Sequence, residues 1–580
     1  MSNIKQFKPK MIERFAKPNL NYTKDVLPSG TLKLIPLGGV GDVTKNMYVY
    51  EYGDDIVIID CGVGFPDEGM LGIDLVIPDI SYLRDKKSKI RGIIITHGHD
   101  DHIGGLPYLW PELDVPIYSQ RLTCGMIKAK FTEHNLPKDK IHELKITDTV
   151  RLGGFSASFY RVSHSVPDST GIVLRTPVGT IIHQSDFKID WTPVNGQVPD
   201  VATIAKVGSE GVLLMTIDCL RVEKQGYTLS ERTIEPTFAE VEQKTSGKIL
   251  ITMTSSNVTR VQQAINVANK SGRKLALAGR SLESNFQVAR DLGYLEVPSG
   301  LVIAQEEIRR FPPEKLMILI AGSQGQPGSA LSRAANGDHK AVFLGKGDSV
   351  VFSADPIPST ESAQSALIDT LTEKGCNVYY SALTSDLHVS GHAAQEELKL
   401  MLNLAKPKYV VPIGGTFRHM KAFDTMAQSL GFKPEEVLLL KNGDVIDVNK
   451  KGAVVNGSIE VHNVYVDGLG VGDIGQVVLR DRQVLAEDGV VVVVVSIDKK
   501  TGNIIGEPDL VSRGFVYEKA SEDLLEAARS VVKSCLKDHS KEQISVDWRY
   551  IRRNIEENLE KFFYQEMNRK PMILPVVVDL

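Results

Sequence analysis

The chain of 580 residues is too long for one hydrophobic core, and at about 150 residues per domain it predicts about four units. Its content of 42% hydrophobic and 24% charged residues is that of an ordinary globular protein, which excludes disordered, collagen-like and membrane-spanning classes. The net charge of −5 gives no overall attraction for a polyanion, so a nucleic acid would have to bind through local positive charge.

Residues 1–30 form a basic arm with little hydrophobic periodicity. Its positive residues outnumber the negative residues Glu13 and Asp25; they are Lys5, Lys8, Lys10, Arg14, Lys17 and Lys24. We interpret the arm as a solvated segment, and the alternative is an arm that contacts phosphate.

From residue 31 to about residue 230 the chain has the pattern of short strands and turns. Gly53-Asp54-Asp55 predicts one hairpin, and Pro177-Val178-Gly179 predicts another. The predicted strands are Leu32–Leu37, Met47–Tyr52, Ile56–Asp60, Ile93–Ile95, Ser156–Val162, Val173–Thr176 and Thr180–His183. This region is therefore expected to be largely antiparallel.

After about residue 232 the pattern alternates between strands and helices, which is typical of α/β proteins. The predicted strands are Lys248–Thr254, Lys274–Ala278, Leu316–Ala321 and Tyr409–Pro412, and the predicted helices are Val258–Ser271, Ser284–Leu292 and Glu396–Leu404.

A junction near Asn449–Gly457 is expected to precede an α+β tail. The six valines Val490–Val495 predict a buried strand, because such a run is typical of strands that are covered on both faces. Glu522–Lys537 and Tyr550–Phe563 have the apolar spacing of helices, which we expect to pack within their own domain.

The cysteines and the N-terminal residues both indicate the cytoplasm. The start of the chain has no apolar segment of the kind found in signal peptides. The cysteines form no C-x-x-C pair and lie far apart, at Cys61, Cys124, Cys219, Cys376 and Cys535. This spacing favours reduced thiols, so we expect a cytoplasmic protein without a membrane partner.

The densest group of potential metal ligands is Thr96-His97-Gly98-His99-Asp100-Asp101-His102, at the end of a predicted strand. His97 and His99 are two residues apart, so both side chains can point the same way from an extended segment. Imidazole and carboxylate ligands suit Zn²⁺, with Mn²⁺ or iron as alternatives. The segment therefore predicts a metal centre.

Two ions would need more ligands than this segment offers. His164 follows the predicted strand Ser156–Val162, and Asp186 follows Thr180–His183. Strand ends on a rigid sheet are positions from which ligands are commonly drawn. We therefore include both residues among the candidate ligands.

The pattern His97-x-His99-x-Asp101-His102, with the later His164 and Asp186, resembles that of the metallo-β-lactamase superfamily. Further segments resemble the ribonuclease J family, which belongs to the metallo-β-lactamase/β-CASP nucleases; they are residues 62–82, 256–260, 322–325, 388–392 and 569–575. The resemblance extends over nearly the whole chain from about Thr31 onward.

The resemblance implies an α/β fold, in which a four-layer αββα metallo-β-lactamase domain is interrupted by an α/β β-CASP insert and followed by a small α+β C-terminal domain. We accordingly assign residues 1–30 to the arm, 31–230 to the first part of the lactamase domain, 231–390 to the β-CASP domain, 391–450 to the second part and 458–580 to the C-terminal domain. Because the family's C-terminal domain often takes part in oligomerisation, we expect a homodimer, a homotetramer or a hetero-assembly with a ribonuclease J paralogue.

The resemblance also implies a role for each ligand. His97, His99 and His164 would hold one Zn²⁺, Asp101 and His102 would hold a second, and Asp186 would bridge the two. Two ions about 3.5–4 Å apart activate a hydroxide and stabilise both oxygens of an in-line phosphoryl displacement. Asp101 is therefore also assigned a catalytic role.

Further residues match the parts of the family that contact RNA. His392 resembles the β-CASP histidine that protonates the leaving 3′ oxygen, a general-acid role that suits an imidazole near neutral pH. The segments that resemble phosphate-binding ones are Ser256-Asn257-Val258 and His388-Val389-Ser390-Gly391-His392. Some members hold a structural Ca²⁺, whose ligands would correspond to Leu71, Ile73 and Asp467.

The sequence departs from the family pattern near the metals. The family segment Pro-Val-His-Gly-Glu-Tyr-Arg-His is Pro412–His419 in this chain, where Gly414 replaces a ligand histidine and Thr416 replaces the acid. The neighbours of Asp218 are also changed, and Gln184-Ser185 replaces the usual Thr-Gly before Asp186. We expect the second ion to be held more weakly than the first.

Three functions are compatible with these residues. The preferred one is a metal-dependent ribonuclease with 5′-to-3′ exonuclease activity, and with endonuclease activity as a further expectation, that acts in rRNA processing and mRNA decay through a metal-activated hydroxide. It would prefer single-stranded RNA with a 5′ monophosphate. The alternatives are a catalytically weak paralogue that binds RNA or assembles with an active ribonuclease J, and a small-molecule hydrolase of the same superfamily.

Overall fold

A computed structural model describes residues 30–67, 69–194, 197–357, 360–468, 470–498, 505–516, 522–537 and 548–579. The predicted basic arm lies outside these residues except for Gly30. The described chain forms two compact units: residues 30–65 with 75–464, and residues 66–74 with 465–579. Among the described residues, no helix combines the length and hydropathy needed to cross a bilayer.

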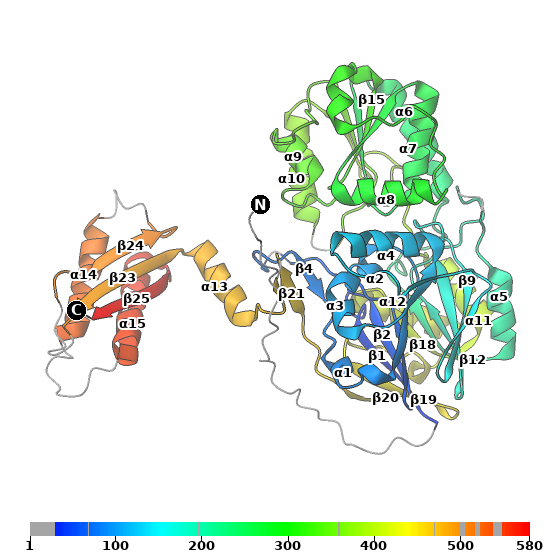
Figure 1. The fold of residues 1–580 in the computed structure, drawn as a ribbon, viewed down its shortest axis with the longest axis horizontal. Helices are drawn as coiled ribbons and strands as arrows, with labels where there is room; N and C mark the ends of the chain where they lie inside the picture. Colours follow the sequence, from blue (N-terminus) through cyan, green and yellow to red (C-terminus); the bar gives the residue numbers. More distant parts are fainter. Residues whose placement is uncertain are drawn as a thin grey trace. The chain divides into compact units, whose positions relative to one another are not determined.

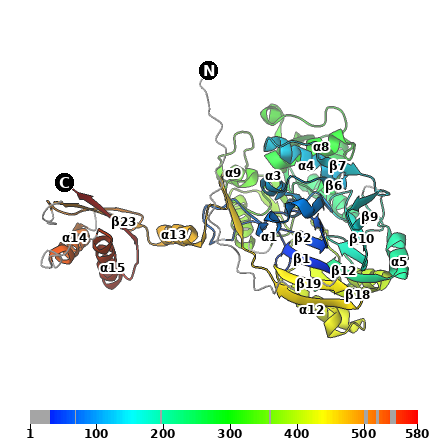
Figure 2. The same cartoon turned by 60° about the horizontal axis from the view of Figure 1, so that its bottom comes forward.

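Two β-sheets form the centre of the larger unit (Figures 1 and 2). The first has the order β20 (Gly452–Ser458), β19 (Asp444–Asn449), β1 (Leu32–Gly38), β2 (Met47–Tyr52), β3 (Asp55–Ile59), β5 (Ile90–Ile94), β6 (Ile117–Gln120) and β7 (Ile141–Leu144). The second has the order β18 (Pro407–Ile413), β12 (Val212–Asp218), β11 (Gly179–Gln184), β10 (Thr170–Thr176), β9 (Phe155–Arg161) and β8 (Thr149–Leu152).

Strands from both sheets contribute to one hydrophobic core. Tyr50 and Val57 of the first sheet belong to the same buried cluster as Ile172 and Leu214 of the second. The first sheet is only partly antiparallel, because β3, β5, β6 and β7 pair in parallel. The expectation of a largely antiparallel region was therefore wrong for these four strands. The helices that border these sheets are α1 (Ser81–Arg84), α2 (Asp100–Ile103), α3 (Leu106–Leu113), α4 (Arg121–Glu133), α5 (Val201–Glu210), α11 (Gln395–Ala405) and α12 (Phe417–Ser429).

A separate α/β domain is inserted between two neighbouring strands of the second sheet, since β12 pairs in parallel with β18 (Figure 1). Its parallel sheet has the order β14 (Lys274–Ala278), β15 (Leu316–Ile320), β13 (Ile249–Thr252), β16 (Ser349–Phe352) and β17 (Asn377–Tyr379). Its helices are α6 (Ile234–Lys244), α7 (Val258–Ser271), α8 (Arg280–Asp291), α9 (Ala330–Asn336) and α10 (Glu361–Glu373). The predicted β-CASP insert is thus confirmed as an α/β element.

The smaller unit contains the C-terminal α+β domain. Its sheet has β23 (Val490–Ile497) between β24 (Asp509–Arg513) and β25 (Met572–Asp579), and α14 (Glu522–Lys537) and α15 (Trp548–Met567) follow the apolar spacing predicted for them. The core lies between the helices and one sheet face, where Val491, Val493 and Val495 meet Ile555 and Leu559. Before this core stand β21 (Val464–Asp467), β22 (Gly470–Val471) and α13 (Gln476–Glu487).

Two predictions from the sequence are corrected. Asn449–Gly457 is no junction, because β19 and β20 pair as a hairpin and the first sheet therefore continues to Ser458, beyond our boundary at residue 450. The valine run does form a strand, but only alternate valines are fully buried, while Val492 and Val494 stay partly exposed. A single helical layer covers one face of a sheet, so only every second side chain is buried.

Candidate metal centre

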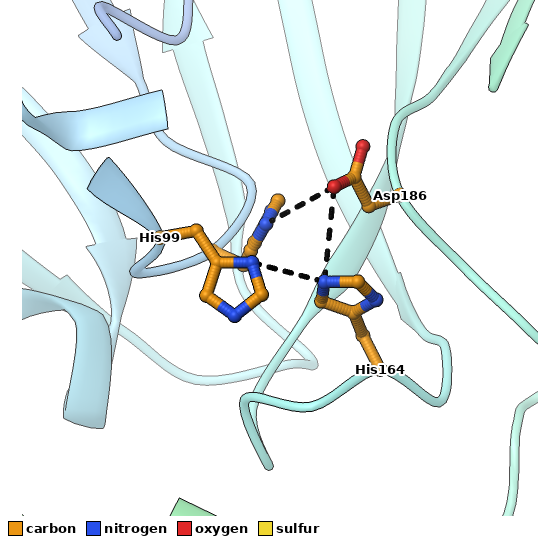
Figure 3. Close-up of side chains that lie close together, drawn as sticks. His99, His164 and Asp186 are labelled. Carbon is orange, nitrogen blue, oxygen red and sulfur yellow. Dashed lines mark hydrogen bonds and ion pairs between the residues drawn. The ribbon is translucent and has the colours of Figure 1, made fainter. Parts of the chain in front are cut away.

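Strand ends bring the predicted ligands together. His97 and His99 follow β5, Asp101 and His102 lie on α2, and Asp186 follows β11. His164 follows β9 and completes the group. Figure 3 shows the ring of His164 joined by dashed lines to the carboxylate of Asp186 and to the ring of His99.

The first ligand set consists of His97, His99, His164 and Asp186, whose donor atoms all lie within 4.8 Å of one another. Asp186 Oδ2 is 3.6 Å from His97 Nε2 and 3.7 Å from His164 Nε2. His164 Nε2 is 3.1 Å from His99 Nδ1. Three imidazole nitrogens and a carboxylate oxygen converging in this way match the donor chemistry of zinc.

The electrostatics of the first ligand set also fit a cation. Burial lowers the pKa of His97 well below its usual value, and it lowers the pKa of His99 to about 3 and that of His164 to about 4. These imidazoles are therefore neutral and keep a lone pair at neutral pH, as metal ligands must. His97 Nε2 is buried without a hydrogen-bond partner, which is the state expected of an atom reserved for an ion.

The outer nitrogens of these rings are held by the protein. His97 Nδ1 lies 3.0 Å from the Thr96 hydroxyl, and His99 Nε2 lies 2.7 Å from the Ser165 hydroxyl. His164 Nδ1 donates to the Gly391 carbonyl oxygen at 2.8 Å. Such contacts fix the ring orientation and the tautomer of a metal ligand.

The second ligand set consists of Asp101, His102 and the shared Asp186. His102 Nε2 is 3.4 Å from Asp101 Oδ2 and 3.5 Å from Asp186 Oδ2. On its other side, His102 Nδ1 contacts Asp60 Oδ2 at 2.8 Å. Burial lowers the pKa of His102, but the carboxylates of Asp101, Asp186 and Asp60 outweigh it and raise the pKa well above its usual value.

Asp60 contacts the second ligand set and is a residue that the sequence reasoning missed. It ends the apolar segment of β3 with a left-handed backbone (φ 61°), which is uncommon for a residue other than glycine. Its carboxylate accepts hydrogen bonds from the Thr96 amide and hydroxyl in addition to its contact with His102. A buried aspartate directly after a strand was the signal that could have identified it.

Gly414 lies at the edge of the second ligand set. A Cβ atom at this position would be 3.4 Å from Asp218 Oδ1 and 4.0 Å from Asp186 Oδ1, so a side chain there would face the ligands. Glycine contributes none, and its backbone has φ +67°, a region that L-residues rarely adopt. His419 does not compensate, because its Nδ1 accepts a hydrogen bond from the Thr416 amide at the start of α12.

His392 lies beside both ligand sets. Its Nε2 is 3.8 Å from Asp186 Oδ2, and its Nδ1 contacts Asp218 Oδ2 at 2.8 Å. Burial lowers the pKa of His392, but Asp218 and Asp186 outweigh it and raise the pKa to about 9. The sequence reasoning noted that Asp218 survives among changed neighbours, but it did not assign this residue to the site.

The two predicted phosphate-binding segments are joined by the buried Arg260. Its guanidinium donates to both carboxylate oxygens of Glu231 at 2.9 Å, to His388 Nδ1 at 2.9 Å and to the Val389 carbonyl oxygen at 3.0 Å. Asn257 caps α7 by accepting from the Arg260 amide at 3.0 Å. The neighbouring residues Ser256 and Val258 are buried, so this segment is rigidly packed.

The segment that ends at His392 passes close to the first ligand set. A Cβ atom on Gly391 would lie 2.5 Å from His164 Cε1, so only glycine fits at this position. The Ser390 hydroxyl accepts a hydrogen bond from the His392 amide at 3.2 Å. The β-CASP segment and the lactamase ligands therefore form one site.

The predicted calcium ligands do not fit an ion in this arrangement. Arg482 donates to the Leu71 carbonyl oxygen at 2.9 Å and to Asp467 Oδ2 at 2.6 Å. A guanidinium thus occupies oxygens that Ca²⁺ would need, and Ile73 alone would be left among the predicted ligands. The sequence reasoning missed Arg482, which lies on α13, 15 positions after Asp467 but 411 positions after Leu71.

The fold and ligand cluster define the class of the protein, a metallo-β-lactamase-type hydrolase with a β-CASP insert. Four family profiles match the chain in agreement with this: "Metallo-beta-lactamase superfamily" at residues 40–189, "Ribonuclease J, beta-CASP domain" at 246–371, "Zn-dependent metallo-hydrolase RNA specificity domain" at 381–438 and "Ribonuclease J C-terminal domain" at 477–580.

Individual proteins are similar over nearly the whole length. The chain is 39% identical to Ribonuclease J2 of Bacillus subtilis (strain 168) over 551 residues, covering 95% of this chain and 99% of that protein. It is 37% identical to Ribonuclease J 2 of Staphylococcus aureus (strain NCTC 8325 / PS 47) over 550 residues, covering 95% and 98%. The chain therefore belongs to the ribonuclease J family, and this membership places it among the metal-dependent ribonucleases.

A solved structure shares the fold alone. A protein of unknown function from Enterococcus faecalis V583 matches with a TM-score of 0.51 at 15% identity, covering 72% of this chain and all of that one.

Proposed function

We propose that this chain is an active ribonuclease that degrades single-stranded RNA from a 5′ monophosphate in the 5′-to-3′ direction and also cleaves internally. We place this activity in the cytoplasm, in rRNA processing and mRNA decay. The observation that carries the proposal is the complete first ligand set, with His392 Nε2 3.8 Å from Asp186 Oδ2.

The ligand sets would hold two Zn²⁺ ions, with Mn²⁺ as an alternative. His97, His99 and His164 would hold the first ion, Asp101 and His102 the second, and Asp186 would contribute to both. When bound, the ions supply Lewis-acid chemistry and lower the pKa of water for attack on phosphorus.

His392 is proposed as the general acid for the leaving 3′ oxygen. The Asp218 carboxylate holds its Nδ1, which leaves Nε2 directed toward the ligand sets. In the protonated state that Asp218 and Asp186 favour, Nε2 would carry the proton that the leaving group takes up. Asp101 is proposed as a second catalytic residue. Its carboxylate is partly exposed and lies beside His102 in the second ligand set.

RNA phosphates would be held by Ser256, Asn257 and Val258 on one side and by His388 to Gly391 on the other. Arg260 supports this role, because one guanidinium positions both segments. It also forms an ion pair with the buried Glu231. Arg260 is therefore a positioning residue rather than a catalytic one.

The alternative function, a catalytically weak paralogue, is favoured by Gly414 and Thr416. Without an imidazole at position 414, the second ligand set has three protein residues, one of them shared. Such a protein would act by binding RNA or by assembling with an active ribonuclease J.

The decisive experiment compares the wild-type protein with His97→Ala/His99→Ala on 5′-monophosphorylated RNA in Zn²⁺ or Mn²⁺. We expect mononucleotides from the wild type and no product from the variant. Equal product from both proteins would refute the proposal. Two tightly held ions per chain, together with fast turnover, would rule out the weak paralogue.

We further propose that the chain assembles through its C-terminal domain as a homodimer, a homotetramer or a hetero-assembly with a paralogue. The support is the sheet face opposite α14 and α15, where Val511, Leu574, Val576 and Val578 are exposed. A contiguous apolar face of this kind is typical of an interface. Light scattering of wild type and Val576→Asp tests this, and a monomeric wild type would contradict it.

A further inference from the structure

Three large apolar side chains near the metal centre take no part in the chemistry described above. Trp191 is 53% exposed, and Tyr227 and Leu229 are each 56% exposed. Single exposed apolar residues are normal, but a group of them on adjoining segments marks a binding surface. We call these three residues the stacking patch.

The two segments that carry the stacking patch adjoin each other. The Ser230 hydroxyl lies 2.9 Å from Asp190 Oδ2 and 3.0 Å from the Thr192 carbonyl oxygen. Since Asp190 and Thr192 flank Trp191, these contacts hold the chain segment of Trp191 next to the segment of Leu229 and Ser230.

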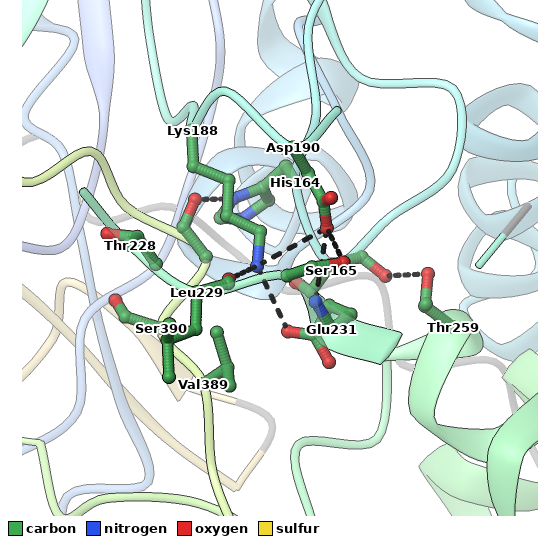
Figure 4. A network of polar contacts seen from close by, with 12 residues as sticks. His164, Ser165, Lys188, Asp190, Thr228, Leu229, Glu231, Thr259, Val389 and Ser390 are labelled. Atoms are coloured by element: carbon green, nitrogen blue, oxygen red, sulfur yellow. Dashed lines mark hydrogen bonds and ion pairs between the residues drawn. The ribbon is translucent and has the colours of Figure 1, made fainter. Parts of the chain in front are cut away.

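The buried Lys188 strengthens this connection (Figure 4). Its Nζ donates to the Leu229 carbonyl oxygen at 3.0 Å and lies 3.7 Å from Glu231 Oε1. A small cavity next to this network is lined by His164, Lys188, Glu231 and Pro193 among others. The segment of Trp191 therefore borders the first ligand set through His164.

The backbone of residues 227–230 directs the patch outward. Thr228 is buried between the exposed Tyr227 and Leu229, and this alternation of burial is what a chain shows when successive side chains point to opposite sides. Thr228 donates from its amide to Glu397 Oε2 at 2.8 Å and from its hydroxyl to the His392 carbonyl oxygen at 2.8 Å. The inner side of this segment is thus fastened to the residue that we propose as the general acid.

We propose that Trp191 and Tyr227 stack against bases of the single-stranded RNA whose phosphodiester lies at the metal centre, and that Leu229 adds apolar contact to the same bases. The inference rests on the proposed ribonuclease function and adds a base-binding subsite to it. Stacking on aromatic rings accepts any base, because every base has a π-face, and so it suits an enzyme that follows a strand of varying sequence. The exposed Arg232, which donates to the Pro193 carbonyl oxygen, adds a positive charge for the phosphate backbone.

RNA is a better occupant of the patch than a protein partner. Both segments lead directly into the site, one from Asp186 through Lys188 and the other through the Thr228 contact with His392. A protein bound there would cover the approach to the ligands, whereas a strand of RNA must pass close to them. Base stacking also requires only rings that are accessible from solvent, as those of Trp191 and Tyr227 are.

The experiment measures binding of a fluorescent 5′-monophosphorylated single-stranded RNA in EDTA, so that cleavage does not interfere. We expect Trp191→Ala and Tyr227→Ala each to weaken binding about tenfold, and Trp191→Phe to retain most of the affinity. The matched control is Phe343→Ala, which removes an exposed aromatic ring beside Arg309 on the inserted domain and should leave binding unchanged.

An abasic oligonucleotide of the same length separates stacking from charge. We expect wild type and Trp191→Ala to bind it equally, because it retains the phosphates and lacks the bases. RNA should also quench the part of the tryptophan fluorescence that is lost in Trp191→Phe, because Trp110 and Trp548 are present in both proteins and their contribution cancels in the comparison.

The outcomes distinguish this inference from the proposed function. If wild type binds and cleaves RNA but the Trp191→Ala/Tyr227→Ala variant binds it equally well, the stacking subsite is refuted and the ribonuclease function stands. If that variant loses affinity for the abasic strand as strongly as for RNA, stacking is likewise refuted. If wild type neither binds nor cleaves RNA, both proposals fall.

Discussion

The two ligand sets of the metal centre share Asp186 but differ in how completely the protein surrounds an ion. The first ligand set adds three imidazoles to Asp186, and each ring is oriented by a hydroxyl or a carbonyl group. The second adds only Asp101 and His102, and Gly414 borders the place where a further ligand would stand. Both sets draw on the segment after β5, but the first gains His164 from a further strand end, whereas the second gains no ligand from position 414, so we expect one strong and one weak half in the same site.

The largest effect is expected from the first ligand set. His97→Ala/His99→Ala removes two of its three imidazoles, so the variant should lose its tightly bound metal and its ability to cleave RNA. Metal analysis by mass spectrometry and an RNA cleavage assay measure the two losses. Retention of two ions by this variant would contradict the expectation that the first ligand set binds its ion more strongly than the second.

His392→Ala is expected to reduce kcat by about a hundredfold, as the loss of a general acid typically does. Because His392 donates a proton and does not bind the ions in our proposal, metal content should remain that of the wild type. Single-turnover cleavage and metal analysis of one protein preparation test both statements. Loss of an ion would instead place His392 with Asp186 and Asp218 in a third ligand group, which their separation permits.

Asp60→Asn tests the support of the second ligand set. The change keeps the shape of the side chain but removes the charge that faces His102 Nδ1. We expect the affinity for the second ion to fall by about tenfold to a hundredfold, with the first ion unaffected. Competition with a zinc chelator measures both affinities, and an equal loss of the two ions would contradict the assignment.

Gly414→His is expected to give the smallest effect, and it is a gain. A side chain at this position faces Asp186 and Asp218, so an imidazole could add a ligand to the second ligand set. The positive φ of residue 414 costs an L-residue roughly 1–2 kcal/mol, which limits the improvement to about tenfold in affinity. Gly414→Ala is the matched control, because it carries the same backbone strain without a ligand.

The sequence alone predicted the parts of the site that are close together in the chain. The segment 97–102 contains five potential ligands in six residues, and strand patterns placed His164 and Asp186 at the ends of strands. The α/β insert and the α+β tail were also predicted, because apolar periodicity depends on neighbouring residues. The family resemblance added the role of His392, which no local pattern would have indicated.

The partners of these residues could not be predicted from local sequence. Asp60 contacts a histidine 42 positions away, Arg260 a histidine 128 positions away and Asp218 a histidine 174 positions away. Each of these three residues looks ordinary in its own segment. Only strand pairing and the return of the chain from the insert bring the members of each pair together.

The sequence by itself thus determined the ligand types and the order of strands and helices, which depend on residue identity and short-range spacing, while its resemblance to the ribonuclease J family indicated the fold class and the missing imidazole at Gly414. The tertiary structure decided which rings are neutral, which carboxylate holds which imidazole, and that the segment of Trp191 adjoins the segment of Leu229. It also decided that Arg482 takes the oxygens predicted for calcium. The physical reason is that burial, charge pairing and packing depend on groups far apart in the chain, and these meet only when the sheets have formed.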